Sequence, residues 1–178
     1  ALAAGLLSMV CNLTVGKKGY EGAQADMEKI LARSEEIRKQ LPALLQADTE
    51  VYSQVMAANR MPRKTPEEKA ARDAAMQKAL KAASEVPLQI AALCAEIIAL
   101  CLPAAQKGNK WAVSDAGVGV LFAEACMRGA LLNVEINLAS LQDESFKAYL
   151  RSEMTRITAG KSALKEQVME IVLKTVRG

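Results

Sequence analysis

Apolar residues recur along the chain with the 3.6-residue period of an α-helix, and no stretch alternates as a strand would. The pattern predicts helices over residues 1–15, 23–59, 66–85, 86–102, 114–141, 144–158 and 160–176. Pro42 should kink or split the second segment. Gly16, the Thr65–Pro66–Glu68 capping box and Asp143 supply the expected helix ends. We therefore expect an all-α bundle of about six helices in a single domain, 1–178.

Residues 114–141 form the segment around which the other helices are expected to pack. The segment has no proline, and apolar side chains lie around most of its circumference, as in a helix buried at the centre of a bundle. Ser114 is its predicted N-cap, which places Asp115 in the first turn. The apolar and small-residue surfaces of the predicted helices are larger in total than one thin bundle can bury. We therefore expect a two-fold homodimer.

Polar residues that remain on such a helix are candidates for function. Asn133 and Asn137 are four residues apart and share a face. Asp115 shares that face too, but it lies 18 residues from Asn133, or roughly 27 Å along the axis. A single small reacting centre cannot touch both ends. The acid and the asparagines therefore have separate roles, bind one long ligand, or meet through a second subunit.

Composition narrows the chemistry. The chain has no histidine, which excludes a histidine base, a histidine-activated nucleophile and a histidine metal site. Proton transfer then falls to carboxylates, lysines, tyrosines or thiols. The four cysteines form no C-x-x-C pair and lie in apolar helical runs, so we expect buried thiols in a reducing cytosol. The cysteines are Cys11, Cys94, Cys101 and Cys126.

Charge and hydropathy indicate neither a nucleic-acid nor a membrane partner. The net charge is +3 and aromatic residues make up 3% of the chain, so nucleic-acid binding is not expected. Residues 86–105 are long enough to span a membrane, but Gln89, Glu96 and two prolines interrupt them. No signal peptide is recognisable. We expect no membrane association and a cytoplasmic location.

Three groups of residues could carry chemistry. Asp115 could exchange a proton at the helix N-terminus; the alternative is an ordinary first-turn acid. Lys17 and Lys18 could hold an anionic ligand, or could simply be solvated at a helix C-terminus. Asp48 and Tyr52, four residues apart, could form a polar pair in a cleft or lie on a solvated face.

Three stretches together resemble the cyclodeaminase/cyclohydrolase family, which includes the C-terminal half of formiminotransferase-cyclodeaminase and stand-alone bacterial relatives. The stretches are 1–20, 48–68 and 108–143, and the most specific motifs are S-D at 114–115 and N-V-x-I-N-L at 133–138. The resemblance covers nearly the whole chain in order. Family members carry a glycine-rich P-G-G-G-S turn before the first long helix. The sequence begins after that point, so we expect the turn to be missing.

The resemblance implies a homodimeric cytosolic enzyme of folate one-carbon metabolism that uses neither metal nor organic cofactor. Its catalytic aspartate matches Asp115. Lys17 or Lys18 would bind the glutamate tail of the folate, and Asp48 would bind the pterin. We add Asn133 and Asn137 as candidate substrate-binding residues. The first expectation is cyclodeamination of 5-formiminotetrahydrofolate to 5,10-methenyltetrahydrofolate plus ammonia. The alternatives are 5,10-methenyltetrahydrofolate cyclohydrolase, which gives 10-formyltetrahydrofolate, and a non-catalytic helical scaffold.

Overall fold

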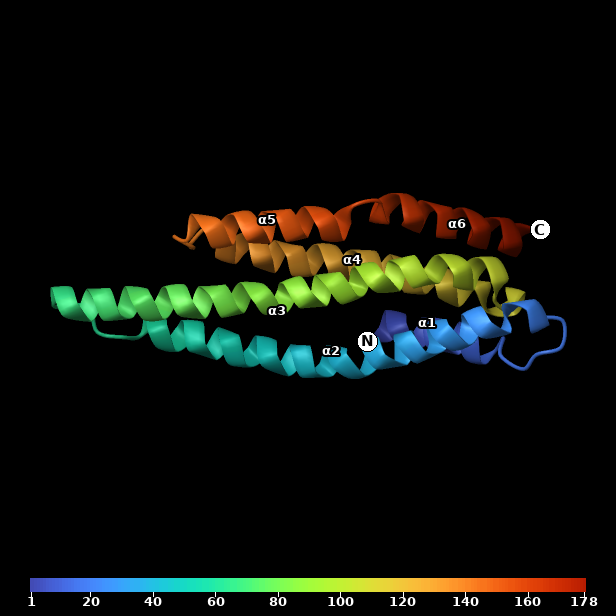
Figure 1. Cartoon of the computed structure of the whole chain (residues 1–178), viewed down its shortest axis with the longest axis horizontal. Helices are drawn as coiled ribbons and strands as arrows, with labels where there is room; N and C mark the ends of the chain where they lie inside the picture. The colour runs from blue at the N-terminus through green and yellow to red at the C-terminus, as the bar shows by residue number, and fades with distance from the viewer.

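The computed structural model describes all 178 residues as helices and short connections. The α-helices are α1 (Leu2–Asn12), α2 (Gln24–Asn59), α3 (Pro66–Lys107), α4 (Val113–Leu138), α5 (Glu144–Thr158) and α6 (Lys161–Arg177). Two 3₁₀ turns, η1 (Glu21–Ala23) and η2 (Lys110–Ala112), precede α2 and α4. The helices lie along one long axis, with α5 and α6 on one side, α3 and α4 in the middle, and α1 and α2 on the other side (Figure 1). The predicted all-α bundle is confirmed.

Prolines break fewer helices than the sequence predicts. α2 continues through Pro42, and α3 continues through Pro87 and Pro103. The predicted boundary near residue 86 is therefore wrong, as is the assignment of residues 103–107 to a connector. An interior proline costs a helix about 3 kcal/mol. The second half of α3 offsets this cost because it supplies many buried core residues.

The predicted N-caps are correct at two helices and wrong at a third, and the predicted C-cap Gly16 is also wrong, because α1 ends at Asn12 with Leu13 as its C-cap. Thr65 and Glu68 form the capping box of α3, and Asp143 caps α5 by accepting a hydrogen bond from the Phe146 N–H at 3.0 Å. α4, however, begins one residue before Ser114 and has Ala112 at its N-cap. The preceding η2 turn takes over this role, because the Asn109 side chain accepts a hydrogen bond from the Trp111 N–H at 3.1 Å. Asp115 remains in the first turn of α4.

The core joins all six helices, but α4 is not buried on every side. Ala116, Val120 and Ala123 of α4 are buried, and Gly119 lets α1 approach, since an added Cβ would lie 3.4 Å from the Ala3 carbonyl oxygen. A second face of α4 carries large exposed apolar side chains: Val118, Leu121, Phe122, Leu132 and Ile136. The prediction that α4 is buried all round is therefore wrong for this chain alone. The apolar side chains of α2 are not all buried either, because Leu45 is 67% exposed.

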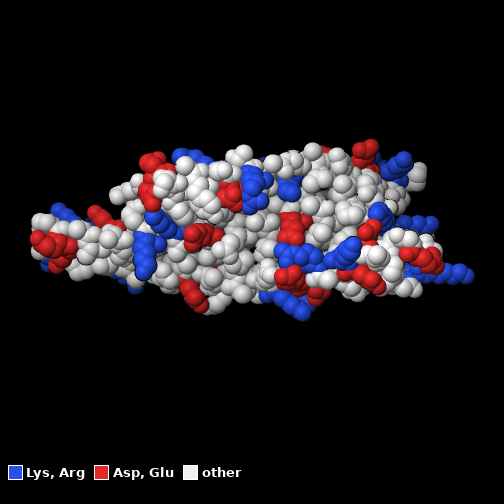
Figure 2. All heavy atoms as spheres, in the orientation of Figure 1, with Lys and Arg blue, Asp and Glu red and all other residues white.

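Two helices pass a length-and-composition test for membrane spans. The most apolar windows of α3 and of the segment from Lys110 to Leu138 are 50% and 44% buried inside the bundle. Core helices of globular bundles pass the same test, so the feature is weak evidence for a span. Lysines, arginines and acids are interspersed over the visible face without a large region of one sign (Figure 2).

Three of the four thiols are sealed in the core. Cys11, Cys94 and Cys101 are buried, whereas Cys126 is exposed, against the prediction for that residue. Burial raises the pKa of the Cys101 thiol to about 12 and those of Cys11 and Cys94 to about 11.

These pKa values predict the reactivity of the thiols. Since the thiolate is the reactive form, we expect a disulfide reagent at about pH 8 to titrate at most one thiol of the native protein quickly, and all four after unfolding. Fast reaction of two or more native thiols would contradict the described packing.

Candidate functional site

Asp115 stands half-buried at the N-terminal end of α4, with buried neighbours on the same turn. Next to it, Gly117 lies so close to α6 that an added Cβ would be 3.1 Å from Val172. The Asp115 carboxylate makes no hydrogen bond or ion pair with the rest of the chain, and it lines none of the five main cavities. A carboxylate in that position is free to accept a proton from a ligand.

The lysine-bearing turn lies at the same end of the bundle. Buried Thr14 accepts a hydrogen bond from the Asn109 N–H at 2.8 Å, and the Asn109 side-chain amide donates to the Leu13 carbonyl oxygen at 3.0 Å. These bonds tie the end of α1 to the start of α4. The turn itself then bends at Gly16 and Gly19, which have φ of 70° and 88°.

Lys17 and Lys18 are exposed on this turn. The Lys17 ammonium lies 5.7 Å from the centroid of the Tyr20 ring, and the Tyr20 hydroxyl accepts a hydrogen bond from the Lys110 N–H at 3.1 Å. The turn is therefore attached to the segment that leads into α4. Two cations and the Asp115 carboxylate share one end of the molecule.

A second group of predicted residues meets at a cavity between α2, α3 and α4. The cavity has a volume of about 370 Å³, and Asp48, Tyr52, Asn133 and Asn137 supply its polar lining. Ligand pockets of small-molecule enzymes begin at about 300 Å³. Apolar side chains complete the wall: Val51, Val55, Ala83 and Ile136.

The two asparagines differ in what they are free to bind. The Asn137 amide donates to the Ala83 carbonyl oxygen at 2.9 Å, which links α4 to α3. Asn133 is exposed and has no hydrogen-bond partner within the chain. Of the two side-chain amides, only that of Asn133 is therefore entirely free to bind a ligand.

The structure groups the predicted residues in two places. Asp48, Asn133 and Asn137 line one cavity, while Asp115 shares the opposite end of α4 with the lysine turn. Asp115 and Asn133 are separated by 18 residues of one continuous helix, or about 27 Å. One protomer thus holds a proton-transfer group and a polar cavity that do not meet.

Some lining residues were not predicted from the sequence. Val51 and Val55 are four residues apart, as are Asp48 and Tyr52. The helical period of α2 therefore predicts that these residues lie near one another on the helix surface. Ala83 and Ile136 carry no such pattern, because α3 and α4 place them there by tertiary packing. The contact between Tyr20 and Lys110 spans 90 residues and is likewise invisible to local spacing.

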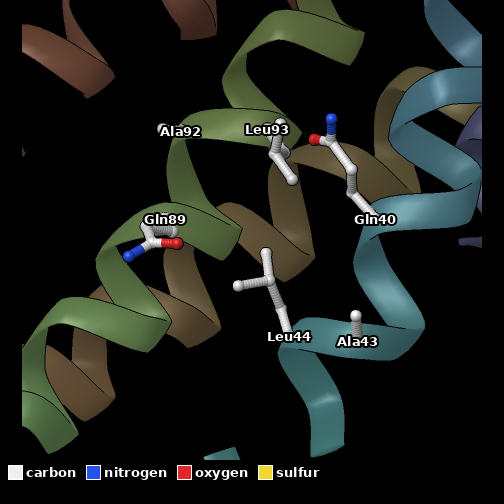
Figure 3. Close-up of a pocket in the computed structure, with 6 residues that line it drawn as sticks. All are labelled: Gln40, Ala43, Leu44, Gln89, Ala92 and Leu93. Atoms are coloured by element: carbon white, nitrogen blue, oxygen red, sulfur yellow. The ribbon is translucent and has the colours of Figure 1, made fainter. Parts of the chain in front are cut away.

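A larger cavity lies between α2 and α3 and has a different character. Its volume is about 400 Å³, and its lining is Gln40, Ala43, Leu44, Gln89, Ala92 and Leu93 (Figure 3). None of these side chains can donate or accept a proton near neutral pH, so this cavity offers no acid–base chemistry. Nowhere in the chain do three or more histidine, cysteine or carboxylate side chains converge as metal ligands.

An ion pair holds the start of α5 against α3. The Lys81 ammonium on α3 donates to the Asp143 carboxylate at 2.6 Å, and this partner holds the pKa of Asp143 well below its usual range. A carboxyl group with a lowered folded pKa stabilises the protein above its unfolded pKa of about 3.9 and loses that effect as the pH falls below it.

The Lys81→Met variant tests this linkage. It should be less stable than the wild type near neutral pH, and the difference should shrink as the pH falls from about 4 toward 2. The Lys81 ammonium also lies 5.3 Å from the centroid of the Phe146 ring, and this contact does not change between about pH 4 and about pH 2. Its loss should account for the difference in stability that remains in acid. Urea unfolding of both proteins at several pH values measures the difference in unfolding free energy. A difference that grows as the pH falls would contradict the ion pair between Lys81 and Asp143.

Comparison with known proteins identifies relatives of the whole chain. A family model described as formiminotransferase-cyclodeaminase matches residues 1–156. A methenyltetrahydrofolate cyclohydrolase from Methylorubrum extorquens is 44% identical over 176 residues, which are 99% of this chain and 85% of that protein. A formimidoyltransferase-cyclodeaminase from Gallus gallus is 34% identical over 157 residues, which are 88% of this chain and 29% of that longer protein.

A solved structure shares the fold. The formiminotetrahydrofolate cyclodeaminase from Thermotoga maritima superimposes with a TM-score of 0.86 at 29% sequence identity. The match covers 98% of this chain and 83% of that chain. The bundle described above is therefore the fold of a known folate enzyme over almost its entire length.

Proposed function

The chain belongs to the formiminotransferase-cyclodeaminase family, and on that premise we propose that it hydrolyses 5,10-methenyltetrahydrofolate to 10-formyltetrahydrofolate. One observation carries the choice of reaction: the 44% identity with a methenyltetrahydrofolate cyclohydrolase extends over 99% of this chain and 85% of that protein. The sequence alone ranked cyclodeamination first and hydrolysis second. The length and strength of this match reverse that order.

Asp115 is the base in the proposed reaction. Water adds to the methenyl carbon between N5 and N10, and the Asp115 carboxylate takes one proton from that water. The bond between the carbon and N5 then breaks as the hydroxyl on that carbon loses its proton and becomes a carbonyl, and N5 accepts a proton, which leaves the formyl group on N10. One proton is released overall, since the substrate carries a positive charge that the product lacks. No other carboxylate lies in the first turn of α4.

The remaining candidates bind the substrate. The cavity of Asp48, Asn133 and Asn137 takes the pterin, whose ring nitrogens and amino group match carboxylate and amide partners. Because Asp115 and this cavity lie about 27 Å apart on one protomer, the base acts on a pterin held by the second protomer of a homodimer. Lys17 and Lys18 hold the carboxylates of the glutamate tail. We also propose that the enzyme is a cytosolic homodimer and needs no metal or organic cofactor.

Cyclodeamination is the second candidate, and the structural match to the Thermotoga maritima cyclodeaminase supports it. In that reaction N10 of 5-formiminotetrahydrofolate attacks the formimino carbon and ammonia leaves. The proton from N10 passes to the departing amine, and Asp115 can accept and return it. The same residues serve both reactions.

The deciding experiment supplies each folate separately to the purified protein. Loss of methenyl absorbance above the uncatalysed rate, without ammonia release, is the expected result for hydrolysis. Ammonia release from 5-formiminotetrahydrofolate without methenyl hydrolysis would instead establish cyclodeamination. Turnover of neither folate would favour the scaffold alternative and overturn both enzymatic assignments.

Asn133→Ala tests the proposed pterin contact. Asn133 has no partner in the chain, so its loss should leave stability almost unchanged. Losing its hydrogen bond to substrate should raise KM by roughly 5- to 30-fold with little change in kcat. Steady-state kinetics measure the effect, and an unchanged KM would remove Asn133 from the site.

A further inference from the structure

We propose that the Trp111 side chain stacks on the p-aminobenzoyl ring of the folate. The inference rests on the proposed function and adds a substrate-binding residue to the same site. Tryptophan side chains are highly buried on average in folded proteins. Trp111 is instead 80% exposed, more than any other large hydrophobic residue of the chain, and it is the one tryptophan that the chain contains. Its indole therefore has a face to offer a ligand.

Trp111 lies between the groups that the proposed function assigns to this end of the molecule. Its turn, η2, runs directly into α4, so the indole stands about one helical turn before Asp115. Side chains one turn apart on a helix have Cβ atoms about 5–6 Å apart, and helical side chains lean toward the N-terminus. The Asp115 side chain therefore leans toward the turn that carries the indole.

The backbone of Trp111 is held in place although its ring is exposed. The Trp111 N–H donates to the Asn109 side-chain oxygen at 3.1 Å, and the Asn109 N–H donates to the buried Thr14 hydroxyl at 2.8 Å. These bonds attach the indole to the end of α1, just before the lysine turn. An indole also has only two side-chain torsions, so a ligand orders it at a low cost in entropy.

Cations and aromatic rings alternate from this indole to the lysine turn. The Lys110 ammonium lies 5.2 Å from the centroid of the Trp111 ring. The Lys17 ammonium lies 5.7 Å from the centroid of the Tyr20 ring, and the Tyr20 hydroxyl accepts a hydrogen bond from the Lys110 N–H. Tyr20 is partly buried and committed to this contact, whereas Trp111 keeps an open ring face beside the lysines.

The order of chemical groups in a folate matches the order of side chains at this end of the bundle. The p-aminobenzoyl ring joins N10 to the glutamate, and the reacting methenyl carbon is bonded to N10. The ring therefore lies next to the carbon that receives the water activated by Asp115. The glutamate carboxylates follow on the other side of the ring, where Lys17 and Lys18 are proposed to bind them. A flat ring at the intermediate position stacks favourably on an aromatic side chain, and Trp111 presents one there.

The other aromatic rings are engaged elsewhere. Tyr52 lines the cavity proposed for the pterin. Phe146 and Tyr149 contact each other on α5, with ring centroids 5.9 Å apart, and Phe122 lines a separate apolar cavity. α5 begins at the end of α4 that lies away from the lysine turn (Figure 1). Trp111 is thus the open aromatic ring at the end of the molecule that carries the base.

A series of substitutions at Trp111 tests the stacking contact. Trp111→Ala should raise the KM for 5,10-methenyltetrahydrofolate by roughly 5- to 30-fold with little change in kcat, because stacking is lost from bound substrate and transition state alike. Trp111→Phe keeps a flat ring and should stay within about threefold of the wild-type KM. Trp111→Leu is apolar but not flat, so it should behave like the alanine variant. All three should unfold in urea like the wild type, since the exposed indole buries little surface in the chain.

The single indole also reports the contact directly. Its fluorescence is measured in the Asp115→Asn protein, which should bind 5,10-methenyltetrahydrofolate without hydrolysing it. Acrylamide collides freely with an exposed indole in the free protein, and a stacked ring should block part of this access. We therefore expect the bimolecular quenching constant, obtained from fluorescence lifetimes, to fall when the folate is saturating. An unchanged constant with the folate bound would overturn the proposal.

Tyr149→Ala is the matched control for the kinetic series. It removes a ring from a residue that is 50% exposed on α5, so its KM should equal that of the wild type. A Trp111→Ala enzyme with the wild-type KM, or a Trp111→Leu enzyme that equals Trp111→Phe, would overturn the stacking contact but leave the proposed reaction in place. Wild-type protein that turns over neither folate would instead refute the proposed function, so the two failures are distinguishable.

Discussion

Asp115→Asn should lower kcat for methenyl hydrolysis by at least about 100-fold while the fold and substrate affinity persist. An asparagine has the same shape as the aspartate but cannot accept the proton that leaves the attacking water. The change costs no structural contact, because the Asp115 carboxylate has no hydrogen bond or ion pair within the chain. The loss should therefore appear in kcat and leave the unfolding free energy almost unchanged.

The control for this substitution is Glu170→Gln. Glu170 is an exposed carboxylate on α6, so the same acid-to-amide change there should leave turnover at the wild-type rate. Both variants are compared by initial rates at saturating substrate and by urea unfolding. An Asp115→Asn enzyme that works within a few-fold of the wild type would remove this residue from the chemistry.

The second large effect is expected at Gly108, where α3 ends. A Cβ at this position would lie 2.4 Å from the Ala104 carbonyl oxygen and 2.9 Å from Val10. The backbone oxygen cannot move without opening the last turn of α3, because the Gly108 N–H donates to it at 2.9 Å. Gly108→Ala should therefore destabilise the protein by about 1–3 kcal/mol, as overpacked core sites do.

Gly22→Ala is the matched control for Gly108→Ala. An added Cβ at Gly22 meets nothing within 4 Å, and the residue lies outside the long helices. Its stability should be equal to that of the wild type or slightly higher, since alanine restricts the unfolded chain. Urea unfolding of both variants measures the difference. Equal stability of Gly108→Ala and the wild type would contradict the close packing between α1 and the end of α3.

Gly108 also matters for the site, because the next residue ties the start of the lysine turn to the segment that leads into α4. Asn109 bonds both Thr14 and Leu13 and caps the η2 turn that leads into α4. Strain at Gly108 should shift Asn109 and, through it, the first turn that holds Asp115. We therefore expect Gly108→Ala to lose activity as well as stability.

Local chemistry in the sequence predicted the helices well. The 3.6-residue period fixed the all-α class, and the side chains of Thr65 and Asp143 cap the helices as predicted. The spacing of Asp48 and Tyr52 correctly placed both on one face, which the cavity confirms. Each of these features depends on residues within about one helical turn of each other.

Features that depend on distant residues were not predictable. α3 remains one helix through Pro87 because buried packing outweighs a local cost. Ser114 loses its predicted role as a cap because Asn109 holds the turn before it. The exposure of Leu132 could not be read from α4 alone, since it depends on which other helices pack beside that position. The candidate site residues come from residue spacing and from the family resemblance, and the tertiary structure shows which of them line one cavity.

The most direct test of this account is the initial rate at which the purified protein consumes 5,10-methenyltetrahydrofolate. The account predicts a loss of methenyl absorbance that rises in proportion to protein concentration, gives 10-formyltetrahydrofolate and releases no ammonia. A rate equal to that of buffer alone, at every protein concentration, would contradict it.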